Sequence, residues 1–220
     1  MLVVAIMGNG PVDHVPDMGP YKEKVDIWIG ADQGALILLE HGITIDYAVG
    51  DFDSVNATQK AMILENSTHL ATYPSMKNET DLEIALNKAF ELNPEEIYLF
   101  GVTGGRLDHA LINMQLLQTI VDREIRGIII DQWNRLELTN PGNHTVSKKE
   151  DYPYVSFVPF TNEVKGLSLI GFAYPLNSYH LKQGSTRCIS NEIKANQASY
   201  SYAEGLLLLI QSRDTKTITY

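Results

Sequence analysis

Two aspartates stand one residue apart directly after a short apolar stretch of the chain, in the segment Gly50-Asp51-Phe52-Asp53-Ser54. A turning backbone can aim Asp51 and Asp53 at one point, and the preceding glycine lets a ligand come close to the main chain. Carboxylate oxygens suit Mg²⁺, which binds one or two carboxylates together with waters and substrate phosphates. The segment therefore indicates a magnesium–phosphate site, although Asp51 and Ser54 are equally suited to capping a helix that begins near Asn56.

Asp32 and Asp81 stand in comparable places. Asp32 follows the apolar residues 25–29 within a glycine-containing turn, and Asp81 opens a segment with helical spacing. Lys77, just before Asp81, is a cation that can hold a phosphate as a point charge. Asp81 also has a simpler interpretation, because a carboxylate at a helix N-terminus complements the helix dipole.

A glycine-rich turn with an arginine follows a later apolar stretch, where residues 101–109 read G-V-T-G-G-R-L-D-H. Such a turn before a helix can present backbone N–H groups to an anion, and Arg106 offers a planar fork to phosphate oxygens. Asp108 and His109 open the helix, where His109 either orients Asp108 or caps the helix. The chain has no Walker A pattern, and Gly8-Asn9-Gly10 is followed by proline, which does not match the dinucleotide fingerprint.

The elements that must position these residues belong to an α/β domain. Residues 80–92 and 108–121 carry apolar side chains at helical spacing, and Thr80 with Glu83 predicts a capping box. These helices alternate with short apolar runs that predict buried strands at 2–7, 25–29, 47–49, 69–73, 97–100 and 128–130. The pattern predicts a Rossmann-like, three-layer domain over residues 1–132, with a parallel sheet between helices. Ligands bind beyond the carboxyl ends of strands in such sheets, so we expect these acidic turns to converge.

Residues 133–220 show a different pattern. Helical periodicity disappears, and Gly, Pro, Asn and Ser separate short apolar segments such as 135–138, 154–158, 164–169 and 206–211. Short strands at this spacing predict an all-β sandwich or barrel as a second, C-terminal domain.

The charge composition of the chain argues against some classes of binding partner. Lys and Arg number 17 against 27 Asp and Glu, which gives a formal net charge of −10. Such a surface repels phosphate backbones and anionic lipid, so we expect neither nucleic acid nor membrane as a partner. The single cysteine, Cys188, cannot form an internal disulfide, and the N-terminus lacks the basic region of a signal peptide. We therefore expect a cytoplasmic protein.

Taken in order, these segments resemble the thiamin pyrophosphokinase family. The matching residues are Gly30-Ala31-Asp32-x-Gly34-Ala35, Gly50-Asp51-Phe52-Asp53-Ser54, Lys77-x-x-Thr80-Asp81, Gly104-Gly105-Arg106-x-Asp108-His109 with Asn113, and Gly184-Ser185 leading to Ser190-Asn191-Glu192. The resemblance implies an N-terminal α/β domain that holds ATP and Mg²⁺, a C-terminal β domain that holds thiamin, and a homodimer with active sites between subunits.

The resemblance also implies residue roles. It assigns catalysis to Asp51, Asp53, Asp81 and Asp108, metal binding to Asp51, Asp53 and Asp81, ATP or phosphate binding to Asp32, Lys77, Thr80, Arg106 and His109, and thiamin binding to Ser190 and Asn191. An asparagine amide suits the aminopyrimidine edge, although Ser190-Asn191 is equally compatible with an ordinary turn. The chain departs from the family pattern at Asn78, where an acidic residue is frequent, and at Gln33, where glycine is common.

The reaction implied is in-line attack of the thiamin hydroxyl on the β-phosphorus of ATP, with AMP leaving. Asp108 is suited either to binding the metal or to accepting the hydroxyl proton. Two other classes fit part of the pattern. A nucleotide-sugar transferase also uses D-x-D with a divalent cation, and a non-catalytic module binds thiamin or nucleotide without turnover.

Overall fold

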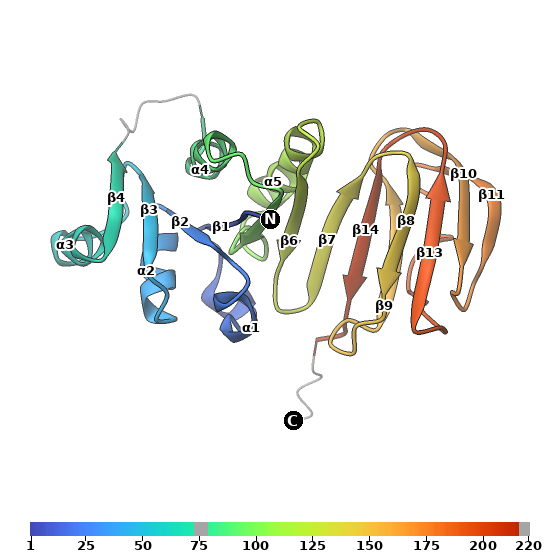
Figure 1. Cartoon of the computed structure of the whole chain (residues 1–220), viewed down its shortest axis with the longest axis horizontal. Coiled ribbons are helices and arrows are strands. Elements are labelled where there is room, and N and C mark those ends of the chain that lie inside the picture. Colours follow the sequence, from blue (N-terminus) through green and yellow to red (C-terminus); the bar gives the residue numbers. More distant parts are fainter. Residues whose placement is uncertain (73–78, 216–220) are drawn as a thin grey trace. The chain divides into compact units, whose positions relative to one another are not determined.

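The structure, a computed structural model, describes residues 1–72 and 79–215. Its contacts divide the chain into two compact units, Met1–Gln132 and Trp133–Tyr220 (Figure 1). Within the described residues, no helix is long and apolar enough to cross a membrane.

A parallel sheet forms the centre of the first unit. Its strands lie in the order β6-β5-β1-β2-β3-β4, and each neighbouring pair is parallel. β1 and β5 are buried along their whole length, as expected for strands that are covered on both faces. The strands are β1 (Val3–Met7), β2 (Ile27–Ala31), β3 (Ile45–Gly50), β4 (Ser67–Thr72), β5 (Glu96–Phe100) and β6 (Arg126–Ile130).

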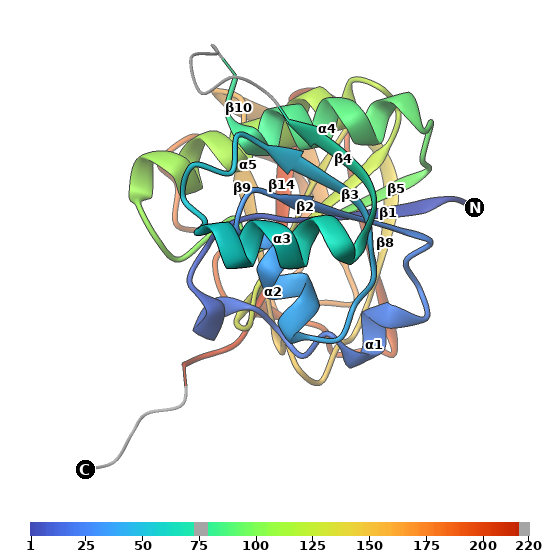
Figure 2. The same cartoon turned by 90° about the vertical axis from the view of Figure 1, so that its left-hand side faces the viewer.

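Helices cover both faces of this sheet. Figure 2 shows α4 and α5 on one side of the strands and α1 and α2 on the other. α4 buries Leu82, Ala85, Leu86 and Ala89, which recur at the spacing of one helix face. The helices are α1 (Gly19–Lys22), α2 (Gly34–Glu40), α3 (Ala57–Glu65), α4 (Asp81–Glu91) and α5 (Leu107–Val121), with a short 3-10 helix at Val12–His14.

The strand order reverses direction at β1. The chain runs outward through β2, β3 and β4, and then returns to place β5 and β6 on the other side of β1. The chain therefore passes from β1 to α1 on one face of the sheet and from β5 to α5 on the other (Figure 2). A crevice opens at such a point in open α/β sheets, and it is where they bind ligands.

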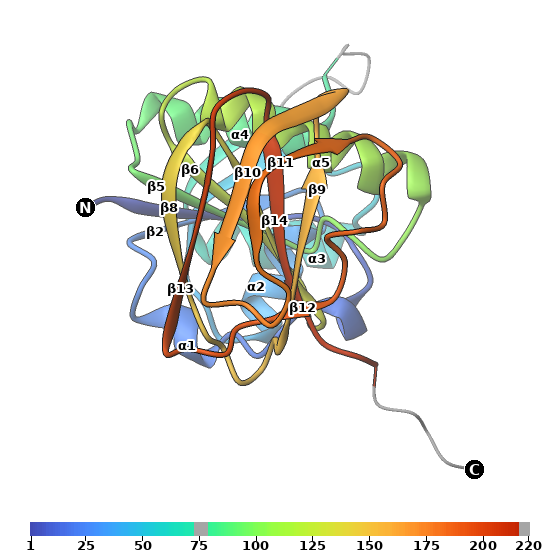
Figure 3. The ribbon, with the colours of Figure 1, turned by 90° about the vertical axis from the view of Figure 1, so that its right-hand side faces the viewer.

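Antiparallel strands form the second unit. Within the described residues, its strands β12, β9, β14 and β7 are neighbours in one sheet, in that order, and β11, β10, β13 and β8 are neighbours in another. Figure 3 shows β8, β13, β10 and β11 in front of β9 and β14. Their bounds are β7 (Asn134–Thr139), β8 (Gly142–Ser147), β9 (Tyr154–Pro159), β10 (Glu163–Ile170), β11 (Leu176–Lys182), β12 (Asn191–Glu192), β13 (Gln197–Tyr202) and β14 (Leu207–Ser212).

The core of the second unit lies between these sheets. Phe157 and Leu209 from one sheet share a buried cluster with Leu167 and Tyr200 from the other. The Tyr202 hydroxyl donates to the Thr139 carbonyl, which joins β13 to β7. The predicted fold class, an α/β domain followed by an all-β domain, is confirmed, and the β domain is a sandwich.

Candidate active site

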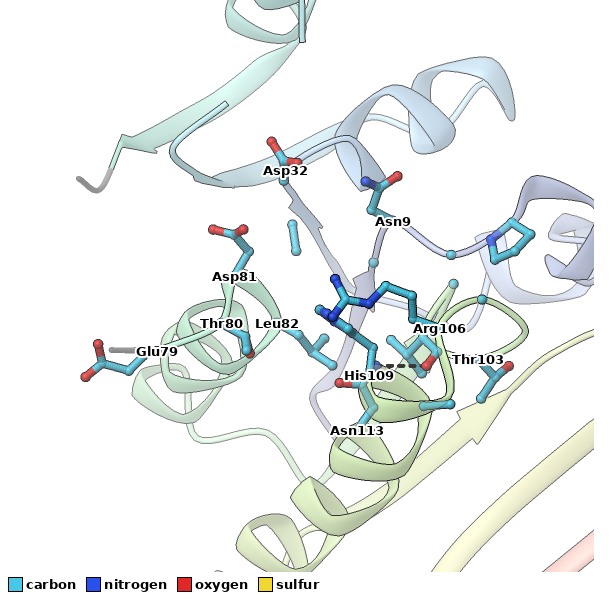
Figure 4. A pocket seen from close by; sticks show the side chains of 18 of the residues that line it. Asn9, Asp32, Glu79, Thr80, Asp81, Leu82, Thr103, Arg106, His109 and Asn113 are labelled. Atoms are coloured by element: carbon cyan, nitrogen blue, oxygen red, sulfur yellow. Dashed lines mark hydrogen bonds between the residues drawn. The ribbon is translucent and has the colours of Figure 1, made fainter. Parts of the chain in front are cut away.

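A cavity of about 530 Å³ lies at the carboxyl ends of the first unit's strands. The loops after β1, β2, β3 and β5 line it, together with the first turns of α4 and α5. In Figure 4, the side chains of Asp32, Asp81, Arg106 and His109 face the same space. Its lining residues from the predicted site are Asp32, Asp51, Thr80, Asp81, Arg106 and His109.

The turn after β3 gives Asp51 and Asp53 different environments. The Asp51 carboxylate accepts the backbone N–H of Asp53 at 3.1 Å and lines the cavity, whereas Asp53 is exposed. Capping of α3 does not use Asp51, because Asn56 and Gln59 form the complete capping box of that helix. The alternative in which Asp51 and Ser54 cap this helix is therefore wrong, and Asp51 lines the cavity instead.

Asp32 is held in a strained and buried turn after β2. Its φ of 49° lies in the left-handed region, and its side chain is 8% exposed. One carboxylate oxygen, Oδ2, accepts the Ser54 hydroxyl. The other oxygen, Oδ1, is buried and has no hydrogen-bond partner among the described residues. A buried carboxylate oxygen without a donor is costly, so this atom fits a bound donor or cation.

The carboxylates at this edge of the sheet act on one another. The pKa of Asp53 is raised, first by the negative charge of Asp51 and then by a small loss of hydration, a hydrogen bond with Asp51, and the charges of Asp32 and Asp81. A carboxylate raises the pKa of a neighbouring carboxyl group when no positive charge nearby offsets their repulsion. The group therefore favours the arrival of a cation.

These residues fit Mg²⁺ better than they fit a metal held by protein alone. Among residues 1–72 and 79–215, no three His, Cys, Asp or Glu side chains come together as a preformed metal site. Mg²⁺ needs only one or two carboxylates when waters and substrate phosphates complete its shell. Asp51, Asp53 and Asp81, with the unpartnered oxygen of Asp32, meet that requirement.

The start of α4 brings Asp81 to the cavity. The Thr80 hydroxyl accepts the backbone N–H of Glu83 at 3.2 Å, so the helix begins where the sequence predicts. Thr80 and Asp81 both line the cavity. Lys77 and Asn78, which precede them, lie outside the described residues.

Arg106 and Asp108 form a bidentate ion pair at the start of α5. The Arg106 Nη2 and Nε atoms donate to the two Asp108 oxygens at 2.6 and 3.1 Å. These hydrogen bonds hold the pKa of Asp108 below its usual value, so the carboxylate stays charged. Arg106 and His109 line the cavity, whereas Asp108 lies outside its lining. The backbone N–H of His109 donates to Asp108, while the imidazole ring faces the cavity.

The side-chain amide of Asn191, in the second unit, is hydrogen-bonded to the backbone. Its Oδ1 accepts the N–H groups of Tyr174 at 3.0 Å and of Glu192 at 2.9 Å, and its Nδ2 donates to the Tyr174 carbonyl at 2.9 Å. Asn191 is 3% exposed and lines a second cavity of about 370 Å³ with Tyr174 and Arg187. Ser190, at a left-handed φ of 55°, donates its N–H to the Ser156 hydroxyl.

Comparison with known proteins gives two family matches. Residues 19–129 match the thiamin pyrophosphokinase catalytic domain, and residues 143–207 match the thiamin pyrophosphokinase vitamin B1 binding domain. The chain belongs to the thiamin pyrophosphokinase family.

Close relatives agree with this family along nearly the whole chain. The thiamine pyrophosphokinase of Bacillus subtilis (strain 168) is 40% identical over 214 residues, which is 97% of this chain and all of the relative. The crystal structure of thiamine pyrophosphokinase from Bacillus subtilis matches with a TM-score of 0.91 at 39% identity, covering 97% of this chain and all of that one. The structure from Geobacillus thermodenitrificans matches with a TM-score of 0.88 at 40% identity, covering 99% and 100%.

Membership of the thiamin pyrophosphokinase family confirms the resemblance read from the sequence. The chain is accordingly a diphosphotransferase. That reaction rests on charge neutralisation and on positioning.

The loop after β1 is part of the cavity that the sequence did not predict. Gly8, Asn9 and Gly10 line it, although the proline that follows excludes the dinucleotide fingerprint. A Cβ at Gly8 or Gly10 lies 2.7 Å from the Gly101 carbonyl, so only glycine lets the two loops approach so closely. The signal was a glycine pair directly after the first strand.

Hydrogen bonds of two buried side chains, Asn113 and Asp131, fix the loop after β5. The Asn113 Nδ2 atom donates to the Val102 carbonyl at 2.8 Å, and the Thr103 hydroxyl donates to Asp131 at 2.7 Å. Asn113 and Thr103 also line the cavity, and Asp131 is 4% exposed. Asn113 follows Asp108 in the family motif, whereas nothing in the spacing of Thr103 and Asp131 predicts that they meet.

Proposed function

We propose that the cavity at the carboxyl ends of β1, β2, β3 and β5 binds ATP together with Mg²⁺. The chain then transfers the β,γ-diphosphate of ATP to the hydroxyl of thiamin and releases AMP. The observation that carries this proposal is the gathering of Asp32, Asp51 and Asp81 in the same cavity as Arg106. Carboxylates for a cation and a guanidinium for phosphate oxygens are the two halves of a metal–nucleotide site.

Asp51, Asp53 and Asp81 are the residues we assign to the metal. Asp51 and Asp81 line the cavity, and the charges of both raise the pKa of Asp53. Bound Mg²⁺ supplies positive charge that neutralises the phosphate oxygens. Asp32 contributes through its unpartnered Oδ1, which suits a donor or cation at the same place.

Arg106, His109, Thr80 and Lys77 are the residues we assign to the phosphates. The ion pair with Asp108 fixes the plane of the Arg106 guanidinium and leaves its remaining N–H groups for phosphate oxygens. We propose that Asp108 acts through this orientation of Arg106. Its lowered pKa makes it a weak base, which disfavours the alternative in which it accepts the hydroxyl proton.

The thiamin side lies in the second unit, where we assign Ser190 and Asn191. Because the Asn191 amide already makes three hydrogen bonds to backbone, we propose that it acts by holding Tyr174. The Tyr174 side chain is 70% exposed beside the second cavity and offers an aromatic face to a ring of the substrate.

We further propose a cytoplasmic homodimer. The family resemblance implies the dimer, and α5 supports it with exposed apolar side chains at Leu107, Leu111 and Ile112, next to the cavity residues of the same helix. Cytoplasmic placement agrees with ATP as the co-substrate and with the free thiol of Cys188. Analytical ultracentrifugation of the wild type and of Leu111→Lys tests the dimer, which the lysine is expected to weaken.

The deciding experiment incubates the protein with ATP, thiamin and Mg²⁺ and separates the products by chromatography. We expect AMP and thiamin diphosphate in equal amounts, only when metal is present. Asp51→Asn and Asp81→Asn should lower turnover by about two or more orders of magnitude while the circular dichroism spectrum stays unchanged. Glu79→Gln removes one charge from the same cavity and serves as the control.

Each contrary outcome identifies a different error. ADP with thiamin monophosphate overturns the diphosphate transfer but keeps the nucleotide site. Binding without turnover indicates the non-catalytic module. Near-normal turnover of Asp51→Asn or Asp81→Asn at saturating Mg²⁺ removes the metal assignment.

A further inference from the structure

We propose that Gln33 is a positioning residue for the metal-binding turn. It fastens the turn after β2 to the turn that carries Asp51 and Asp53, and so sets the affinity for the metal–nucleotide complex. The inference rests on the proposed metal role of these aspartates. It concerns a residue at which this chain departs from the glycine that the family resemblance leads us to expect.

The contacts between the two turns form what we name the turn clasp, made by Asp32, Gln33, Val49 and Ser54. The Asp32 N–H donates to the Val49 carbonyl at 2.8 Å. The Ser54 hydroxyl donates to the Asp32 carboxylate, and the Gln33 Nε2 atom donates to the Ser54 carbonyl at 2.9 Å. Asp32 and Gln33, from the turn after β2, thus bind residues on both sides of the turn that carries Asp51 and Asp53.

The Gln33 amide is available for this contact because α2 does not use it. Gln33 occupies the N-cap position of α2, yet its side chain makes no capping hydrogen bond. Ser, Thr, Asp and Asn are preferred at that position because a short side chain reaches back to the helix N–H groups. The longer glutamine side chain crosses to Ser54 instead, so its role belongs to the neighbouring turn.

The clasped turn is one that needs support. Phe52, between the two aspartates, has a φ of 55°, and Asp32 has a φ of 49°. Left-handed backbone at such residues costs about 1 kcal/mol or more and persists only where surrounding contacts hold it. The Phe52 side chain is 3% exposed, which anchors the middle of the turn, and Gln33 anchors its end at Ser54. Asp53 lies between these two anchors.

A pair of isosteric substitutions isolates the contact. Gln33→Met keeps the size and helix preference of a half-buried residue but removes the donor to Ser54. Gln59→Met is the matched control, because Gln59 also loses one side-chain bond, from the Asn56 N–H, at the start of the next helix. Both variants are measured for thermal stability, for the Mg²⁺ concentration that gives half-maximal turnover, and for kcat at saturating Mg²⁺.

We expect Gln33→Met to raise the half-saturating Mg²⁺ concentration about two- to tenfold, the range of one neutral hydrogen bond, with kcat at saturating Mg²⁺ within about twofold of wild type. Gln59→Met should lower thermal stability without that rise. A readout independent of turnover is the titration of Mn²⁺ against each protein with a non-hydrolysable ATP analogue, followed by water-proton relaxation, where Gln33→Met should weaken Mn²⁺ by a similar factor.

Three results overturn the proposal. Unchanged Mg²⁺ dependence and Mn²⁺ affinity in Gln33→Met remove the positioning role. An equal rise in Gln59→Met shows that loss of stability alone produces the effect. A large fall in kcat with unchanged metal affinity places Gln33 in the chemical step. Failure of the proposed function is distinct, because the wild type then shows either no turnover or turnover that does not depend on divalent metal.

Discussion

Replacement of Asn191 by alanine removes a side chain whose amide makes three hydrogen bonds to the main chain of the second unit. Two join it to the N–H and carbonyl of Tyr174, and one to the N–H of Glu192, at 2.9 to 3.0 Å. The residue is 3% exposed, so water does not replace these bonds without a change in the loop.

The structure sets the size of the effect. At about 1 kcal/mol for each bond, the free energy of unfolding should fall by about 3 kcal/mol. For a chain of this size this corresponds to a fall in Tm of about 6–12 °C. Release of the Tyr174 backbone should raise the KM for thiamin about fivefold, which corresponds to the loss of about 1 kcal/mol, or one such bond, from thiamin binding. The KM for ATP should stay the same.

Steady-state kinetics with each substrate varied, together with calorimetry, provide the assay. Asn113→Ala is the matched control, because it removes a buried amide bonded to the Val102 carbonyl in the ATP-side cavity. It should raise the KM for ATP and leave that for thiamin unchanged. A double mutant of Asn191 and Tyr174 separates an indirect role from direct contact with thiamin. If Asn191 acts through Tyr174, the double mutant is no worse than the Tyr174 single mutant.

The reasoning is refuted in either of two ways. An unchanged Tm in Asn191→Ala means that the three bonds contribute nothing to stability. Additive losses in the double mutant mean that Asn191 contacts thiamin itself, as its family role implies.

Three further predictions concern groups elsewhere in the chain. Burial raises the pKa of Tyr202 to about 12, against about 10 in the unfolded chain, so the unfolded state loses the phenol proton first as pH rises. The free energy of unfolding should therefore fall by about 2–3 kcal/mol between pH 10 and 12. Equilibrium unfolding of Tyr202→Phe should not show this loss. Asp108→Asn frees Arg106 and should raise the KM for ATP. Because the hydrogen bonds from Arg106 lower the pKa of Asp108, the wild-type pair stays charged at neutral pH and breaks only as pH falls through that lowered pKa. A change in the KM for ATP between pH 5 and 8 that Asp108→Asn abolishes contradicts the pairing. Thr80→Ala removes the N-cap of α4 and should lower the free energy of unfolding in urea by about 1 kcal/mol, whereas Thr80→Ser should retain it. An unchanged urea midpoint in the Thr80→Ala variant contradicts the capping role.

The sequence alone determined the elements whose pattern is local. Apolar runs marked β1, β5 and β6, and helical spacing with a threonine cap marked α4 and its first residue. It missed β8, β11 and β13, which alternate polar with apolar residues because one face is buried against the other sheet. A search for apolar runs does not detect such strands, because only half of their side chains enter the core.

The candidate site divides in the same way. The sequence identified Asp32, Asp51, Asp81 and Arg106 by residue type and by their places after strands, and the sheet brings them to one cavity because parallel strands share an edge. How these residues are held depends instead on contacts between distant parts of the chain.

Thr103 meets Asp131, Gln33 reaches Ser54, and the Asn191 amide is committed to Tyr174, each across 17 to 28 residues of sequence. Such contacts depend on loop conformation and on which strands become neighbours. They leave no periodic signal along the chain, so spacing cannot reveal them.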